Sequence, residues 1–112
     1  MKTVTISVSS MDETRQRFLV ASKGKRQGAH ITFPTMELLW KVLAPNRMAL
    51  VRALTGAGVV SIREAARRVN RDVRAVHSDV TALINAGVLN RTKDGIEFPY
   101  AAVHVDFTLK AA

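Results

Sequence analysis

Residues 61–99 constrain the fold most strongly, because they carry the start and stop signals of two consecutive helices and then those of a hairpin. The first helix is predicted to begin at Ser61, with Glu64 completing the S-x-x-E spacing of a capping box. Asn70 follows its last apolar position, and Asn tolerates the left-handed conformation that ends a helix. Asp72 then stands where a second helix needs its N-cap. Two helices joined by a very short turn are expected.

The second helix is amphipathic and ends at Gly87. Its apolar residues recur with the 3.6-residue period of a helix and comprise Val73, Val76, Val80, Leu83 and Ile84. The opposite face carries long cations and small or short polar residues, namely Arg71, Arg74, Ala75, Ser78, Ala82 and Asn85. Such residues reach phosphates and base edges when a helix N-terminus enters a major groove. The alternative is that this face is simply exposed to solvent. The turn before the helix and the hairpin after it favour the interpretation that the face enters a major groove.

A hairpin is predicted after the second helix. Asp94-Gly95 is a strong two-residue turn signal, since both central positions of a type I′ turn need a positive φ. Arg91 and Lys93 come just before it. The order of helix, turn, helix and hairpin is typical of a winged helix-turn-helix, in which these two cations would contact the DNA backbone. Ser61 and Arg63, at the start of the first helix of the pair, are added to the predicted DNA-contacting residues.

Three further segments alternate apolar and polar residues, as strands with one buried face do. Their apolar positions are Val4, Ile6 and Val8, then Ala29, Ile31 and Phe33, then Val103, Val105, Phe107 and Leu109. A helix capped by Ser10 and Glu13 is expected between the first two strands. The predicted fold is therefore α+β: an N-terminal strand-helix-strand element in residues 1–34, and a winged helix-turn-helix with an added C-terminal strand in residues 35–112.

The terminal strands must find partners that cover their apolar faces and edges. They can pair with each other within one chain or across the two-fold axis of a dimer. We expect a homodimer, because two related recognition helices read two half-sites and one helix reads few base pairs. The residues predicted to contact the second copy or another partner are Val4, Ile6, Val8, Phe18, Leu19, Val105, Phe107 and Leu109.

Composition narrows the functional class. The 112 residues include 17 basic and 9 acidic side chains, a formal charge of +8, which predicts attraction to a polyanion and a strong dependence on salt. The absence of cysteine excludes disulfides, thiolate catalysis and cysteine-based zinc sites. No apolar run approaches the ~18 residues of a membrane span, and the start lacks a signal-peptide pattern. A cytoplasmic protein that does not bind membranes is expected.

Catalysis is not predicted. The best candidates are three histidines and two aspartates that stand far apart in the sequence, His30, His77, His104, Asp79 and Asp106. They form no His-x-x-x-His pair, no nucleophile motif and no glycine-rich phosphate loop. We therefore expect no catalytic site, no metal and no cofactor.

The stretch from Pro45 to Phe107 resembles a prokaryotic family of winged-helix DNA-binding regulators, through a core similar to SIREAARRVNRDVRAVHSDVTALINAGVL and a later PYAAVHVDF. The helix pair is also similar to that of DeoR-type and MarR-type regulators. The resemblance implies scaffold roles for Asp79, Val80, Leu83, Gly87 and Leu89. Where such proteins often have Thr, Arg or Lys at recognition positions, this chain has Ala75, His77 and Ser78, which leaves its base preference open.

These observations predict a sequence-specific regulator of transcription, a repressor, that binds double-stranded DNA. The resemblance extends to TumA-like antitoxins, so the alternative is an antitoxin that binds a small toxin protein and represses its own operon. An RNA-binding winged helix is a third possibility, because a basic face attracts any polyanion.

Overall fold

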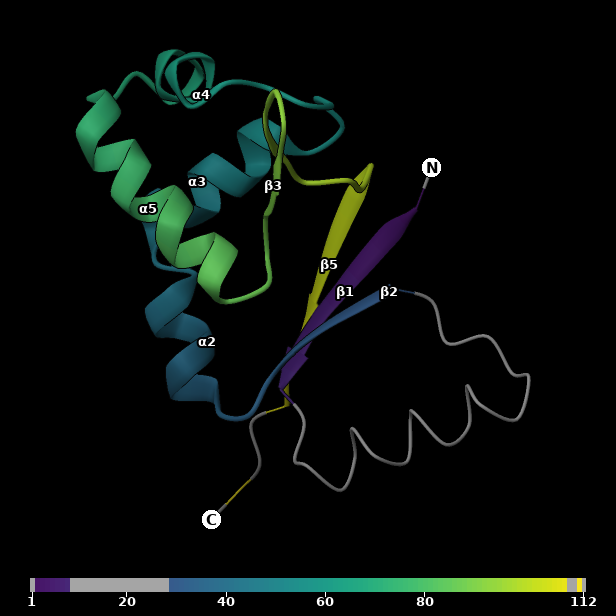
Figure 1. The fold of residues 1–112 in the computed structure, drawn as a ribbon. Helices are drawn as coiled ribbons and strands as arrows, with labels where there is room; N and C mark the ends of the chain where they lie inside the picture. Colours follow the sequence, from purple (N-terminus) through teal and green to yellow (C-terminus); the bar gives the residue numbers. More distant parts are fainter. Residues whose placement is uncertain (1, 9–28, 109–110, 112) are drawn as a thin grey trace.

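The computed structural model describes residues 2–8, 29–108 and 111 (Figure 1). Within them the chain is α+β, as the sequence predicts. Its elements, in chain order, are β1 (Thr3–Val8), β2 (Ala29–Phe33), α2 (Met36–Val42), α3 (Pro45–Leu54), α4 (Ile62–Val69), α5 (Val73–Asn85), β3 (Asn90–Thr92), β4 (Gly95–Glu97) and β5 (Ala102–Asp106). The helices gather on one side of the larger sheet (Figure 1). No helix of the described part is long and apolar enough to cross a membrane.

The larger sheet has the order β2-β1-β5, and both neighbours run parallel to β1. Val4 lies between Ala29 and Val103, and Ile6 lies between Ile31 and Val105. All three expected strands are thus present, and the terminal strands pair within one chain. Because β5 comes from residues 35–112 and β1 from residues 1–34, the two predicted segments share one sheet.

One hydrophobic core joins the sheet to the helices. It includes Leu39 of α2, Leu50 and Leu54 of α3, and Leu83 of α5, all fully buried. Val4 and Ile6 are fully buried in the same core, so in this chain they stabilise the fold and contribute nothing to an exposed surface. Val8 and Val105 are partly buried against the core.

The helix boundaries follow the local sequence. Ser61 accepts a hydrogen bond from the Glu64 backbone N–H at 3.0 Å, and Asp72 accepts one from the Arg74 N–H at 3.1 Å, so both predicted N-caps are confirmed. Asn70 has a φ of 53°, the left-handed conformation expected where α4 ends. In a full capping box the Glu64 carboxylate would accept a hydrogen bond from the Ser61 backbone N–H. Here it accepts hydrogen bonds from Arg67 and Arg68 instead.

Both helices of the pair end in a Schellman motif. At the end of α5, the Val88 N–H donates to the Leu83 carbonyl at 2.9 Å and the Gly87 N–H to the Ile84 carbonyl at 3.0 Å. Gly87 adopts a φ of 81°. Val88 and Leu89 then enter the core and direct the chain into the hairpin.

The predicted type I′ turn at Asp94-Gly95 is wrong by one position. Thr92 pairs with Gly95, so Lys93 and Asp94 are the two loop residues. Neither has the positive φ that a type I′ turn needs, and Gly95 has a φ of 153°. The reason is tertiary: a Cβ on Gly95 would lie 2.2 Å from the Val60 carbonyl oxygen, so the glycine permits close approach of β4 to that segment.

Some expectations fall outside the described residues. The helix between the first two strands, its caps Ser10 and Glu13, and the expected partner contacts Phe18, Leu19 and Leu109 all lie there. Phe107, another expected partner contact, lies within the described residues, and 38% of its surface is exposed.

Candidate nucleic-acid interface

The N-terminal half of α5 presents the polar face that the sequence predicted. Val76 and Val80 are fully buried, while Arg74, Ala75 and Ser78 are exposed, so the two faces of this helix are clearly separated. His77 is exposed beside them, and its carbonyl accepts a hydrogen bond from the Thr81 hydroxyl at 2.9 Å. Within the described part of the chain, the Arg74 guanidinium forms no hydrogen bond or ion pair.

The assignment of Val73 to the buried stripe is wrong, since 41% of its surface is exposed. It is the first residue of α5, directly after the cap Asp72. Its side chain is therefore exposed at the start of the helix, as are those of Arg74 and Ala75.

Arg71, in the turn between α4 and α5, has its guanidinium engaged by a carboxylate. Its Nη1 donates to Asp79 Oδ2 at 2.8 Å, and Arg47 Nε of α3 donates to Asp79 Oδ1 at 3.1 Å. Only 15% of the Asp79 side chain is exposed, against about a quarter of each arginine. Arg47 Nη1 also donates to the Lys41 and Val42 carbonyls at the end of α2. One aspartate thus connects three helices and the turn, which the spacing along the chain did not predict.

α4 carries a second cluster, on its exposed surface. Glu64 Oε2 lies 2.6 Å from Arg67 Nη2 and 2.9 Å from Arg68 Nε. These hydrogen bonds lower the pKa of Glu64 to about 2, and the bond to Glu64 raises the pKa of Arg67. Sequence reasoning missed both arginines as neighbours of the candidate surface, although their spacing of three and four residues from Glu64 is the signal of such helix pairs.

Ser61, the cap before α4, and Arg63, in its first turn, have different surroundings. The Ser61 hydroxyl oxygen already accepts the Glu64 N–H, so this predicted DNA contact acts as a helix cap. Arg63 is exposed, and its side chain forms no hydrogen bond or ion pair with any residue that the structure describes.

The β3–β4 hairpin carries the remaining predicted cations. Arg91 and Lys93 are exposed, and Arg91 pairs with the buried Ile96 across the hairpin. The hairpin is joined to the segment before α4 by two hydrogen bonds, from the Val60 N–H to the Ile96 carbonyl at 2.9 Å and from the Ile96 N–H to the Val60 carbonyl at 2.8 Å. The fold therefore holds the hairpin beside the helix pair (Figure 1).

The histidines considered for catalysis lie on three different elements, His30 on β2, His77 on α5 and His104 on β5. Among residues 2–8, 29–108 and 111, no three His, Asp or Glu side chains gather as a metal site would require.

Comparison with known protein families places the chain in one of them. A family model named HVO_A0114 matches residues 42–105, more than half of the chain, and the chain belongs to this family. The matched residues run from the last residue of α2 through α3, α4, α5 and the hairpin into β5. Searches of curated proteins and of solved structures gave no match.

Proposed function

We propose that this chain is a sequence-specific DNA-binding regulator of transcription, a repressor, in which α3, α4, α5 and the β3–β4 hairpin act as a winged helix-turn-helix. One observation carries the proposal: the first half of α5 exposes Arg74, Ala75 and Ser78 opposite its buried side. A helix that enters a major groove needs such a face at its N-terminal end.

The residues on this face suit base edges. An arginine can donate two hydrogen bonds to guanine, a serine hydroxyl can donate or accept, and an alanine methyl packs against the thymine methyl group. We therefore assign Arg74, Ala75 and Ser78 to base contacts. Arg63, Arg91 and Lys93, all exposed, are assigned to phosphates. Arg71 is assigned to positioning, since Asp79 already accepts a hydrogen bond from its guanidinium.

The charge of the chain supports a polyanionic partner, because a surplus of +8 favours release of counterions from nucleic acid. Selection of bound fragments from a random duplex DNA library, at one stated salt concentration and beside a random RNA library, tests the proposal. Enrichment of one duplex motif supports it. Enrichment of RNA, or duplex binding without a common motif, would overturn it.

Arg74→Ala is expected to weaken binding to the selected duplex by about 1 to 3 kcal/mol and to relax the preference at one base pair, because a bidentate guanine contact is lost. Fluorescence anisotropy with the selected duplex and with single-base variants measures both effects. Arg74→Lys keeps the charge without the planar fork, so it should lose the preference while retaining most of the salt dependence. Unchanged affinity and preference in both variants would contradict the assignment.

Lys93→Ala and Arg91→Ala are expected to weaken binding to all duplexes alike, because phosphate contacts carry no sequence information. Each substitution should lower the slope of log affinity against log salt by about one unit. Lys41→Ala is the charge-matched control: Lys41 is exposed on α2, outside the helix pair and the hairpin, and its loss should leave the slope nearly unchanged. Equal slopes for all three variants would remove the hairpin from the interface.

A further inference from the structure

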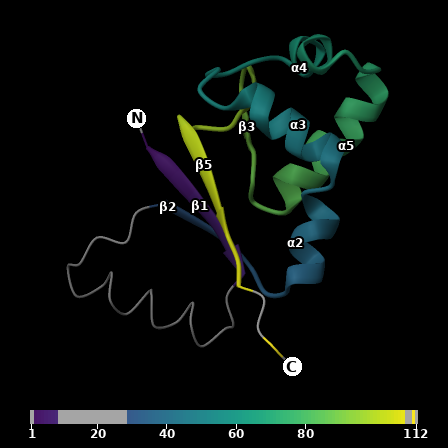
Figure 2. The ribbon, with the colours of Figure 1, turned by 180° about the vertical axis from the view of Figure 1, so that it is seen from behind.

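β5 is an edge strand of the parallel sheet. Its one neighbour in the described part of the chain is β1, and it lies in front of β1 when the molecule is seen from behind (Figure 2). The free edge of a strand presents backbone N–H and C=O groups that can pair with another strand. The side chains of Ala102, His104 and Asp106 are exposed along this strand.

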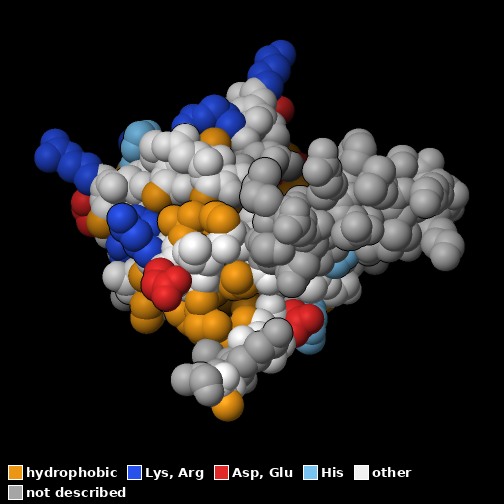
Figure 3. Space-filling view, turned by 90° about the horizontal axis from the view of Figure 1, so that it is seen from below, with side chains coloured by type: hydrophobic (Ala, Val, Ile, Leu, Met, Phe, Trp, Pro, Cys, Tyr) orange, Lys and Arg blue, Asp and Glu red, His pale blue; other side chains and the backbone are white. Residues whose placement is uncertain are grey.

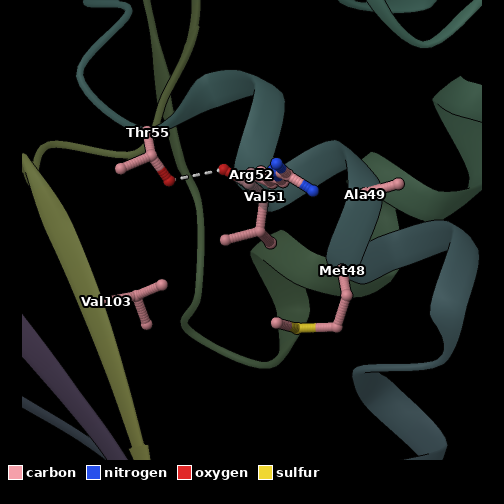
Figure 4. A pocket seen from close by; sticks show the side chains of 6 residues that line it. All are labelled: Met48, Ala49, Val51, Arg52, Thr55 and Val103. Carbon is pink, nitrogen blue, oxygen red and sulfur yellow. Dashed lines mark hydrogen bonds between the residues drawn. The ribbon is translucent and has the colours of Figure 1, made fainter.

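The two ends of β5 carry complementary apolar features. At its carboxyl end, the Phe107 ring packs edge-to-face on Trp40 of α2 with centroids 5.3 Å apart, and the two residues are 38% and 49% exposed. Hydrophobic side chains gather on this face when it is seen from below (Figure 3). Near its other end, an open pocket of about 610 Å³ lies between Val103 of β5 and α3, whose Met48, Val51 and Arg52 line it (Figure 4). A ring thus projects at one end of the strand, and an apolar hollow lies at the other.

We propose that two copies of this chain pair through β5, antiparallel, around a two-fold axis at Val105. Antiparallel strands place residues directly opposite each other with their side chains on the same face. An axis at Val105 puts His104 opposite the partner's Asp106 on the exposed face. It also puts Val103 opposite the partner's Phe107. On pairing, each Phe107 ring exchanges its contact with Trp40 for the partner's pocket between β5 and α3.

Charge selects this register over its neighbours. An axis at Asp106 would place two carboxylates together, and like charges directly opposite are destabilising. An axis at His104 would place each His104 opposite its own copy and leave Asp106 opposite Ala102. An axis at Val103 places His104 opposite Ala102, which offers the imidazole no hydrogen-bond partner. Val105 alone among these positions pairs an imidazole with a carboxylate twice, where a ring N–H can donate to the carboxylate oxygen, and it also places a Phe107 ring beside each pocket. The edge is therefore self-complementary, as the interface of a two-fold dimer must be.

Single cysteines test the register, because the natural chain has none. Val105→Cys brings two Cα atoms to about 4.5 to 5.5 Å across the axis, within the range of a disulfide. Oxidation of the purified full chain should then give a covalent dimer on a non-reducing gel. His104→Cys alone should not cross-link, since its copies lie on a diagonal beyond about 7 Å. A mixture of His104→Cys and Asp106→Cys chains should form the mixed dimer.

Charge exchange tests the same interface without cross-linking. Light scattering of the unmodified protein should give twice the 12.3 kDa chain mass. His104→Asp should weaken the dimer by about tenfold, because two pairs of carboxylates then face each other, and adding Asp106→Lys should restore it. Both substitutions are on exposed side chains, so circular dichroism should show an unchanged fold. A monomeric unmodified chain, or cross-linking by His104→Cys but not Val105→Cys, would overturn the proposal. Light scattering and cross-linking both work without DNA, so the proposed function is tested separately.

Discussion

Asp79→Ala is expected to lower the free energy of unfolding by about 2 to 3 kcal/mol, because it leaves two partly buried guanidinium groups without their carboxylate. Arg47 comes from α3 and Arg71 from the turn before α5, so the loss affects the whole helix pair. For a chain of this size the midpoint of thermal unfolding should fall by roughly 10 °C. Denaturant unfolding followed by circular dichroism measures the change directly.

Glu64→Gln is the matched control, since Glu64 also joins two arginines but does so in solvent. Surface ion pairs contribute little because water and salt screen them, so this variant should change stability far less than Asp79→Ala. The stabilisation by the Glu64 carboxylate in the natural chain also depends on pH. The pKa of Glu64 lies below its usual value, so the stabilisation is complete above pH 4.5 and disappears as the pH falls towards 2. Equal losses for the two variants would show that Asp79 has no special structural role.

The sequence predicted those parts of the fold that depend on neighbours along the chain. Ser61 and Asp72 act as caps, and Asn70 ends α4, because each interaction involves backbone groups at most a few residues away. The alternation of Val4 and Ile6 likewise identified a strand from a period of two. Exposure of Arg74 and Ser78 followed from the same kind of reasoning, applied to the period of a helix.

Features that depend on distant residues were not predicted. Asp79 and Arg47 are separated by 32 positions, and only the packing of α3 on α5 brings them together. The parallel pairing of β1 with β5 joins the two ends of the described chain, a choice that alternation leaves open. The hydrogen bond from Arg71 to Asp79, eight residues further on, likewise depends on how the turn packs against α5.

Gly95→Ala is expected to lower the free energy of unfolding by about 3 kcal/mol. The residue has a φ of 153°, and an added Cβ would lie 2.2 Å from the Val60 carbonyl oxygen and 2.7 Å from its carbonyl carbon. Backbone atoms cannot yield as a flexible side chain can, so β4 must move away from Val60. The movement lengthens the two hydrogen bonds between Val60 and Ile96, each of which contributes about 1 kcal/mol, and the strained φ adds to the loss. Chemical denaturation measures the total.

Gly56→Ala separates the effect of φ from that of the close approach. Gly56 has a φ of 70°, but a Cβ there would meet nothing within 4 Å, so only the conformational cost of about 1 to 2 kcal/mol is expected. Hydrogen exchange locates the difference: Gly95→Ala should speed exchange of the Val60 and Ile96 amides, and Gly56→Ala should leave them protected. Because Arg91 and Lys93 sit on the same hairpin, Gly95→Ala should also weaken duplex binding without altering base preference. Protected amides in both variants would mean that the hairpin is not held through Val60.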